Sequence, residues 1–141
     1  MNDLLGFWTK GMVTYVHSED EGIYFDPDGL GFIMWSNPFI ATFDSFIWCM
    51  DDKGYLNLVG AKKYVYYHGG VQEIRPSEVN EPAMLIKRIR CESLDGEVID
   101  ALVFPKSCNI LSERLLGFIC KDIWSIDFYC DFKKLLSGGG Q

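Results

Sequence analysis

The chain has 141 residues, the size of one domain with a single hydrophobic core. Hydrophobic residues make up 48% of it and aromatic residues 15%, a composition that excludes a disordered chain. Its 13 Lys and Arg against 20 Asp and Glu give a formal charge of -7, which argues against nucleic acid as a partner, because binding to phosphates depends on cationic side chains.

Short aromatic and β-branched runs, separated by turns rich in Asp and Gly, predict an antiparallel meander. The predicted strands are 8–16, 22–26, 30–36, 41–50, 55–59, 62–68, 83–93, 97–104 and 122–130. Residues 69–82, with two Gly and two Pro, predict a break in the pattern, and 111–119 fits a helix and a strand equally well. We expect one mainly β domain over 1–136, with short helices at most, and a flexible tail over 137–141.

One predicted strand is apolar on both faces. From Leu30 to Trp35 only Gly31 interrupts the large apolar side chains. Such a strand is covered on both sides, or its second face lines a cavity or an interface. The preceding Asp26-Pro27-Asp28-Gly29 predicts a hairpin turn, with Pro27 and Asp28 in the turn and Gly29 and Gly31 relaxing the backbone.

Gly6-Phe7-Trp8 near the start of the chain resembles the GxW signature that opens the first strand of lipocalin-like, or calycin, β-barrels. The resemblance implies a meander that closes into a barrel, with Trp8 as a structural residue at the barrel floor and a small apolar ligand in the cup. The chain has no counterpart of the later TDY-like segment of that family. An open curved sheet or a β-sandwich is the alternative fold.

Known catalytic and metal-binding patterns are missing from the sequence. Asp26 and Asp28 could begin a calcium loop, but Leu30 and the following alternate positions are apolar, so the oxygen ligands stop after two. Of the two histidines, His17 precedes an acidic run, which we interpret as an exposed turn, and His68 lies outside any nucleophile motif. We therefore expect no enzyme activity, no metal and no cofactor.

We expect a non-catalytic acidic module that binds a protein partner with a basic surface, as immunity proteins bind bacterial toxins. The candidate contact residues are three turn acids, two residues of the two-sided strand and two acids of a second turn: Glu19, Asp20, Glu21, Ile33, Trp35, Asp51 and Asp52. The alternative is a small apolar ligand held by four apolar residues: Phe32, Met34, Phe46 and Trp48.

The chain has neither a signal-peptide pattern nor an apolar run of membrane-spanning length. Its five cysteines are widely spaced and form no CxxC pair, so we expect most of them to be reduced and buried. These features predict a cytoplasmic protein that does not bind membranes.

Overall fold

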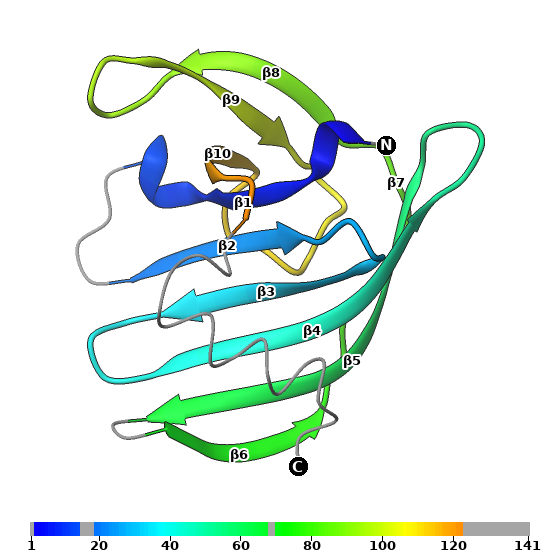
Figure 1. The fold of residues 1–141 in the computed structure, drawn as a ribbon, viewed down its shortest axis with the longest axis vertical. Coiled ribbons are helices and arrows are strands. Elements are labelled where there is room, and N and C mark those ends of the chain that lie inside the picture. Colours follow the sequence, from blue (N-terminus) through cyan, green and yellow to red (C-terminus); the bar gives the residue numbers. More distant parts are fainter. Residues whose placement is uncertain (1, 15–18, 68–69, 123–141) are drawn as a thin grey trace.

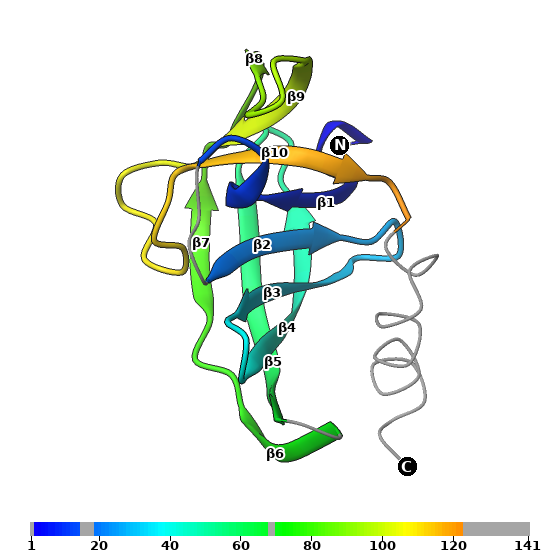
Figure 2. The same cartoon turned by 90° about the vertical axis from the view of Figure 1, so that its left-hand side faces the viewer.

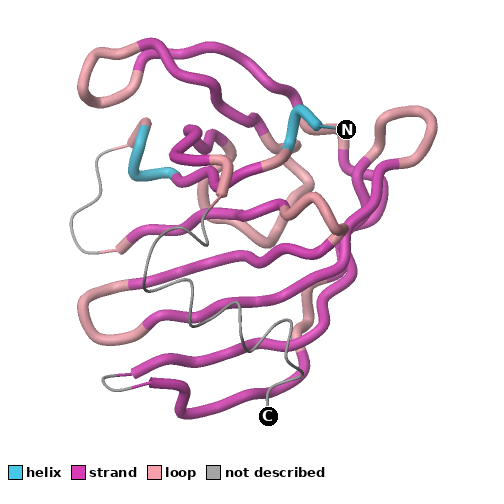
Figure 3. The backbone as a smooth tube through the Cα atoms, viewed as in Figure 1, coloured by secondary structure: helices cyan, strands magenta, loops and turns pink. Residues whose placement is uncertain are grey.

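The computed structural model describes residues 2–14, 19–67 and 70–122. These residues form one antiparallel sheet of ten strands (Figures 1 and 3). Two short 3-10 helices, η1 (Asn2–Leu4) and η2 (Lys10–Met12), flank the first strand. The strands are β1 (Gly6–Thr9), β2 (Asp20–Phe25), β3 (Leu30–Ser36), β4 (Ala41–Met50), β5 (Leu56–Tyr67), β6 (Gly70–Pro76), β7 (Asn80–Met84), β8 (Lys87–Glu92), β9 (Val98–Val103) and β10 (Leu115–Cys120).

The sheet is curved but open. Its strands follow the order β6-β5-β4-β3-β2-β1-β10-β9-β8, with β7 as an additional neighbour of β5. Within the described residues, the end strands β6 and β8 do not pair with each other. The predicted closed barrel is therefore wrong, and the alternative prediction, an open curved sheet, describes the structure. The chain passes from β7 to β8 through Leu85 and Ile86, and there it leaves β5 to pair with β9. Figure 2 shows the β8–β9 hairpin at the upper end of the sheet.

Four predicted strands, 22–26, 30–36, 41–50 and 97–104, agree closely with β2, β3, β4 and β9. The predicted strand 8–16 is wrong over 10–14, and its residues 15 and 16 lie outside the described residues. After Thr9 the chain turns into η2, where the Thr14 amide donates to the Lys10 carbonyl oxygen at 2.8 Å.

The second half of the chain differs more from the prediction. The strands predicted at 55–59 and 62–68 form one continuous strand over the described residues, β5 (Leu56–Tyr67), and the expected break at 69–82 contains β6 and the first three residues of β7. The strand predicted at 83–93 is divided between β7 and β8. Segment 111–119, which fitted a helix and a strand equally well, contributes its residues from Leu115 onward to strand β10. The predicted strand at 122–130, beyond Asp122, and the tail at 137–141 lie outside the described residues.

Strand β3 is buried on both faces, as its sequence predicts. Ile33 belongs to the larger core, whereas Phe32 and Met34 belong to a smaller core on the opposite face. The larger core contains Leu4, Trp8, Ile23, Phe25, Ile33, Phe46, Trp48, Leu56, Leu58, Met84, Leu102, Phe104 and Leu116. The smaller core contains Phe7, Tyr24, Phe32, Met34, Phe43 and Tyr64.

The predicted hairpin between β2 and β3 is confirmed. The Asp26 amide donates to the Leu30 carbonyl oxygen at 2.8 Å, and Gly29 has a φ of 89°, which favours glycine. Gly31 has a different role, because a Cβ there would overlap the Tyr24 carbonyl oxygen and lie 2.6 Å from the Phe46 ring. Gly31 therefore permits close packing rather than an unusual backbone angle.

Trp8 is a fully buried residue of the larger core. Its indole Nε1 donates to the Leu4 carbonyl oxygen at 2.9 Å, and its ring meets Phe118 edge to face at a centroid distance of 5.0 Å. The Arg88 guanidinium carbon lies 5.6 Å from the centroid of the Trp8 ring. These contacts connect β1, β8 and β10, so Trp8 has a structural role in the fold.

Candidate functional site

In the first predicted acidic turn, Glu19 is exposed, whereas Asp20 and Glu21 make hydrogen bonds within the fold. Glu19 is exposed and pairs with Lys10 at 3.7 Å, while the Asp20 carboxylate accepts a hydrogen bond from the Gly11 amide at 3.1 Å. Glu21 is buried, and its Oε1 accepts from the Ser112 amide and hydroxyl at 2.7 and 2.6 Å. The Glu21 carboxylate is therefore used inside the fold and offers little surface to a partner.

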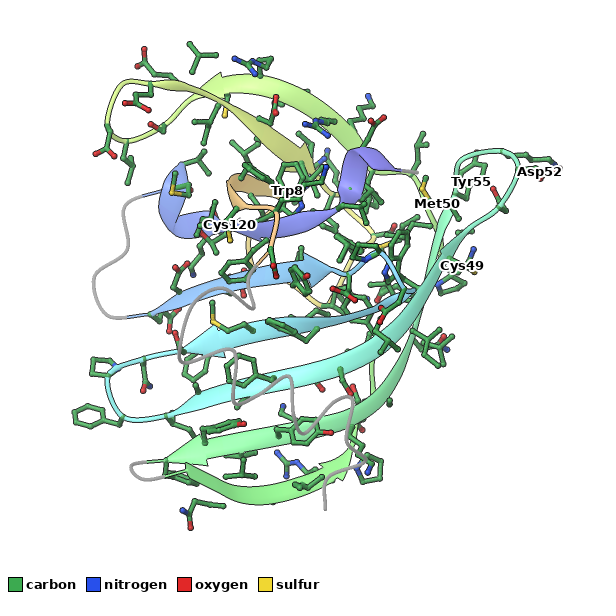
Figure 4. All side chains as sticks on the ribbon, viewed as in Figure 1. Trp8, Cys49, Met50, Asp52, Tyr55 and Cys120 are labelled. Carbon is green, nitrogen blue, oxygen red and sulfur yellow. The ribbon has the colours of Figure 1, made fainter. Side chains whose placement is uncertain are left out.

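The second predicted acidic turn is exposed. Asp51 and Asp52 lie between β4 and β5, where the Asp51 Oδ1 accepts from the amides of Lys53 and Tyr55, both at 2.9 Å. Asp52 stands at the tip of this hairpin, with Met50 and Tyr55 nearer its base (Figure 4). This turn presents carboxylates to solvent.

The two predicted apolar contact residues do not join that turn. Trp35 is half-buried and pairs with Glu21, at the end of β3 away from the Asp26–Gly29 turn. Ile33 lies on the same face of β3 but is buried and lines a large cavity. The predicted partner-binding set is thus spread over both ends of the sheet rather than gathered in one surface.

The alternative set of ligand-binding residues is divided by the sheet. Phe32 and Met34 belong to the smaller core, and Phe46 and Trp48 to the larger one. The larger core is packed with rings in this region: Phe25 lies 5.8 Å from Phe46 and 5.4 Å from Trp48, centroid to centroid. The four residues cannot enclose a single ligand in this structure.

A small groove lies between the Asp26–Gly29 turn, which joins β2 to β3, and the end of β4, which leads into the turn with Asp51 and Asp52. Its volume is about 330 Å³, and Leu5, Pro27, Asp28, Gly29, Trp48, Cys49 and Met50 line it. The Trp48 amide donates to the Gly29 carbonyl oxygen at 2.8 Å, and its indole donates to Asp26 and Leu30 carbonyl oxygens at 3.1 and 3.0 Å. The two turns are therefore held side by side by Trp48.

An exposed aliphatic row crosses the sheet close to these turns in sequence, on the opposite face from the Trp48 side chain. Leu30 pairs with Ile47, and Ile47 pairs with Val59, so the three side chains share one face of β3, β4 and β5. Their exposed fractions are 36%, 58% and 58%. We name this row, together with the exposed carboxylates of Asp28, Asp51 and Asp52, the acid-rimmed face.

The surroundings of Asp28 disfavour the charged form of its side chain. A hydrogen bond between the side chains of Asp28 and Asp26, together with partial burial, raises the pKa of Asp28 above its ordinary value. Asp26 also accepts a hydrogen bond from the Tyr24 hydroxyl at 2.6 Å, and burial raises the pKa of Tyr24. This rim of the groove therefore concentrates negative charge that a cationic group would stabilise.

Reactive and metal-binding groups are scarce in the described residues. No group of three or more His, Cys, Asp or Glu side chains among them is placed to hold a metal ion. His17 and His68 lie outside the part of the chain that the structure describes. Burial raises the pKa of the Cys108 and Cys120 thiols, which keeps them protonated at neutral pH, whereas Cys49 is exposed beside the groove (Figure 4).

Neither the models of known protein families, nor curated proteins, nor solved structures give a match to this chain. No helix in the described ranges has the length and hydropathy that crossing a bilayer requires.

Proposed function

We propose that the protein is a non-catalytic binding module for a protein partner with a basic surface, and that the acid-rimmed face is its docking surface. The observation that carries this proposal is the row of Leu30, Ile47 and Val59, of which Ile47 and Val59 are each 58% exposed in the middle of paired strands. Adjacent exposed aliphatic side chains of this kind are typical of interaction sites.

The arrangement of the face suits a protein partner. Stable interfaces combine an apolar centre with a polar rim, and here Asp28, Asp51 and Asp52 stand in the turns at the end of the aliphatic row. The carboxylates would attract a basic partner from solution, in keeping with the formal charge of -7. The aliphatic row would then supply the area removed from water.

The packing of the interior supports a protein partner over the alternative of an apolar ligand. Phe46 and Trp48 pack against Phe25 within the larger core, whereas Phe32 and Met34 are buried on the other side of the sheet. An apolar cup would require these side chains to surround one empty space.

Among protein-binding modules, we propose an immunity protein that neutralises a basic bacterial toxin as the first class to test. Such a protein acts by covering a surface of its target and needs fast, specific encounter, which opposite charges favour. This proposal retains the expected partner chemistry and adds Leu30, Ile47 and Val59 to its contact residues.

Affinity capture with charge-matched variants tests the proposal. Asp51→Asn with Asp52→Asn removes two exposed carboxylates from the acid-rimmed face, and Asp95→Asn with Glu97→Gln removes two from the exposed β8–β9 turn. We expect the wild type and the β8–β9 variant to capture equal amounts of a basic protein at low salt. The variant at Asp51 and Asp52 should capture at least tenfold less of the same protein. Equal capture by both variants, or native mass spectrometry that shows a retained apolar molecule and no protein, would contradict the proposal.

A further inference from the structure

A second, larger cavity lies on the other side of the sheet from the aliphatic row, and it has a different chemistry. Its volume is about 720 Å³. Charged and amide side chains share its lining with a few aliphatic ones, and the lining residues are Ile33, Asp44, Lys63, Arg75, Pro76, Glu78, Val79, Asn80, Glu81, Asn109 and Ile110. We name it the charged cavity.

One wall of the charged cavity is set by strand register. Ile33 pairs with Asp44, Asp44 with Lys63, and Lys63 with Arg75, across β3, β4, β5 and β6. Residues that pair directly share one face of a sheet, so this row presents one carboxylate and two cations side by side. The Lys63 Nζ lies 4.0 Å from the Asp44 carboxylate, at the limit of an ion pair.

The segment after β6 forms a second wall and is fixed to β5. The Gly60 amide donates to the Val79 carbonyl oxygen at 2.7 Å, and the Ser77 hydroxyl donates to the Asp44 carboxylate at 2.7 Å. A Cβ at Gly60 would lie 2.7 Å from the Ser77 hydroxyl oxygen, so glycine allows this close approach. Glu78 and Glu81 are positioned by these contacts.

Asn109 and Ile110 complete the lining from the connection between β9 and β10. This connection is closed at its base, where the Phe104 amide donates to the Arg114 carbonyl oxygen at 2.8 Å. The buried carboxylate of Glu21 accepts hydrogen bonds from Ser112 and from the Glu113 amide, the latter at 2.9 Å. All three walls are therefore held by hydrogen bonds to the sheet, as expected for a pre-formed site.

Opposite charges stand at separate positions along β5. Lys63 pairs with Arg75, whereas Glu81 pairs with Leu58, five positions away on β5. At the rise of a strand this corresponds to roughly 16 Å between the backbone positions. The separation matches about four residues of extended peptide.

We propose that the charged cavity binds a short extended peptide with free ends, its carboxylate near Lys63 and Arg75 and its ammonium near Glu81. Asn80 and Asn109 can donate to and accept from the peptide backbone, and Ile33, Val79 and Ile110 can contact small side chains. The volume of about 720 Å³ lies within the usual range of ligand sites, roughly 300–1,000 Å³. This inference does not depend on the acid-rimmed face.

An NMR titration of the full chain with tetra-alanine tests the proposal. We expect saturable amide shifts at Ile33, Lys63 and Ile110 with the free-ended peptide, and at least tenfold weaker binding when the same peptide is acetylated and amidated. Equal affinity for the free and the doubly blocked peptide would overturn the proposal. The absence of saturable shifts at these residues with tetrapeptides of Ala, Gly and Leu would also overturn it. Tighter binding of decanol, an apolar ligand without charged ends, than of the free-ended peptide would overturn it too.

Two variants assign the ends of the peptide, with matched controls on β8 and its turn. Lys63→Met should remove the advantage of a free carboxyl end but keep that of a free amino end, and Glu81→Gln should do the reverse. Lys87→Met and Glu97→Gln remove the same charges at exposed positions that do not line the cavity and should change neither preference. This double readout separates a binding role from a loss of folding, because loss of folding would abolish both preferences together.

Discussion

Asp28 shows how a single carboxyl on the acid-rimmed face couples stability to pH. Its folded-state pKa is raised by the hydrogen bond with Asp26, so folding favours the protonated form. The resulting stabilisation is fully present below the ordinary value of 3.8 and is lost as pH rises through the folded-state pKa. At neutral pH the Asp26 and Asp28 pair is a site of repulsion.

Asp28→Asn should therefore stabilise the protein at pH 7 and leave its stability unchanged at pH 3. The gain should be small, about 0.5 kcal/mol or less, because solvent screens a largely exposed group. Urea unfolding at the two pH values measures the difference, and Asp95→Asn in another exposed turn serves as the control. A loss of stability at pH 7 would show that the pair is not repulsive.

Gly31 is the residue at which a single methyl group should cost most in this hairpin. A Cβ there would overlap the Tyr24 carbonyl oxygen and approach the Phe46 ring. We expect Gly31→Ala to destabilise the fold by about 1–3 kcal/mol, the usual cost of overpacking. Gly54→Ala, where φ is 86° and no atom lies within 4 Å, should cost about 1–2 kcal/mol in the same denaturation assay, from the strain of a left-handed backbone alone. The reverse order of the two costs would contradict the packing role of Gly31.

At the scale of elements, Glu21 connects β2 to the β9–β10 connection. Its Oε1 accepts three hydrogen bonds from Ser112 and Glu113, so Glu21→Leu, which has no acceptor, should remove about 1–3 kcal/mol of stability. Hydrogen exchange at the Ser112 and Glu113 amides should become faster. Glu19→Leu, in the exposed position two residues earlier, should leave both amides protected. Unchanged protection of the two amides in Glu21→Leu would contradict this role of Glu21.

The strands with clear turns around them could be predicted from sequence, and β3 and β4 agree with the prediction residue for residue. Gly60 misled the prediction for β5, because a glycine usually weakens a strand and here allows the Ser77 segment to approach. Strands β6 and β7 were missed for a related reason: Gly and Pro at 69–82 obscured short edge strands.

The candidate site could be predicted only in part. The exposure of Asp51 and Asp52 could be predicted because their turn type is visible in sequence, whereas the burial of Glu21 depends on Ser112, 91 positions away. The row of Leu30, Ile47 and Val59 was missed, since register decides which side chains of an apolar strand face solvent. Side chains alternate between the two faces of β4, so the exposure of Ile47 could be predicted once its neighbour Trp48 is known to face the core.

At the scale of the molecule, the open sheet separates two surfaces with different chemistry. One face carries the exposed aliphatic row, the turns with Asp28, Asp51 and Asp52 lie at one end of the sheet, and the opposite face contains the charged cavity. Because the formal charge is -7, association with a basic partner should slow steeply as salt is added, while dissociation should change little. Stopped-flow association rates at two ionic strengths measure this, and a rate independent of salt would exclude electrostatic steering.

The most direct measurement is the affinity of the captured partner for Ile47→Arg compared with Val98→Arg. Ile47 is 58% exposed on the acid-rimmed face and Val98 is 60% exposed on β9, so the two substitutions disturb folding similarly but only one alters the proposed docking surface. We predict that Ile47→Arg weakens binding more than tenfold, by loss of apolar contact and by repulsion of a basic partner, and that Val98→Arg leaves it within twofold. Equal affinities for the two variants would contradict the assignment of this face as the docking surface.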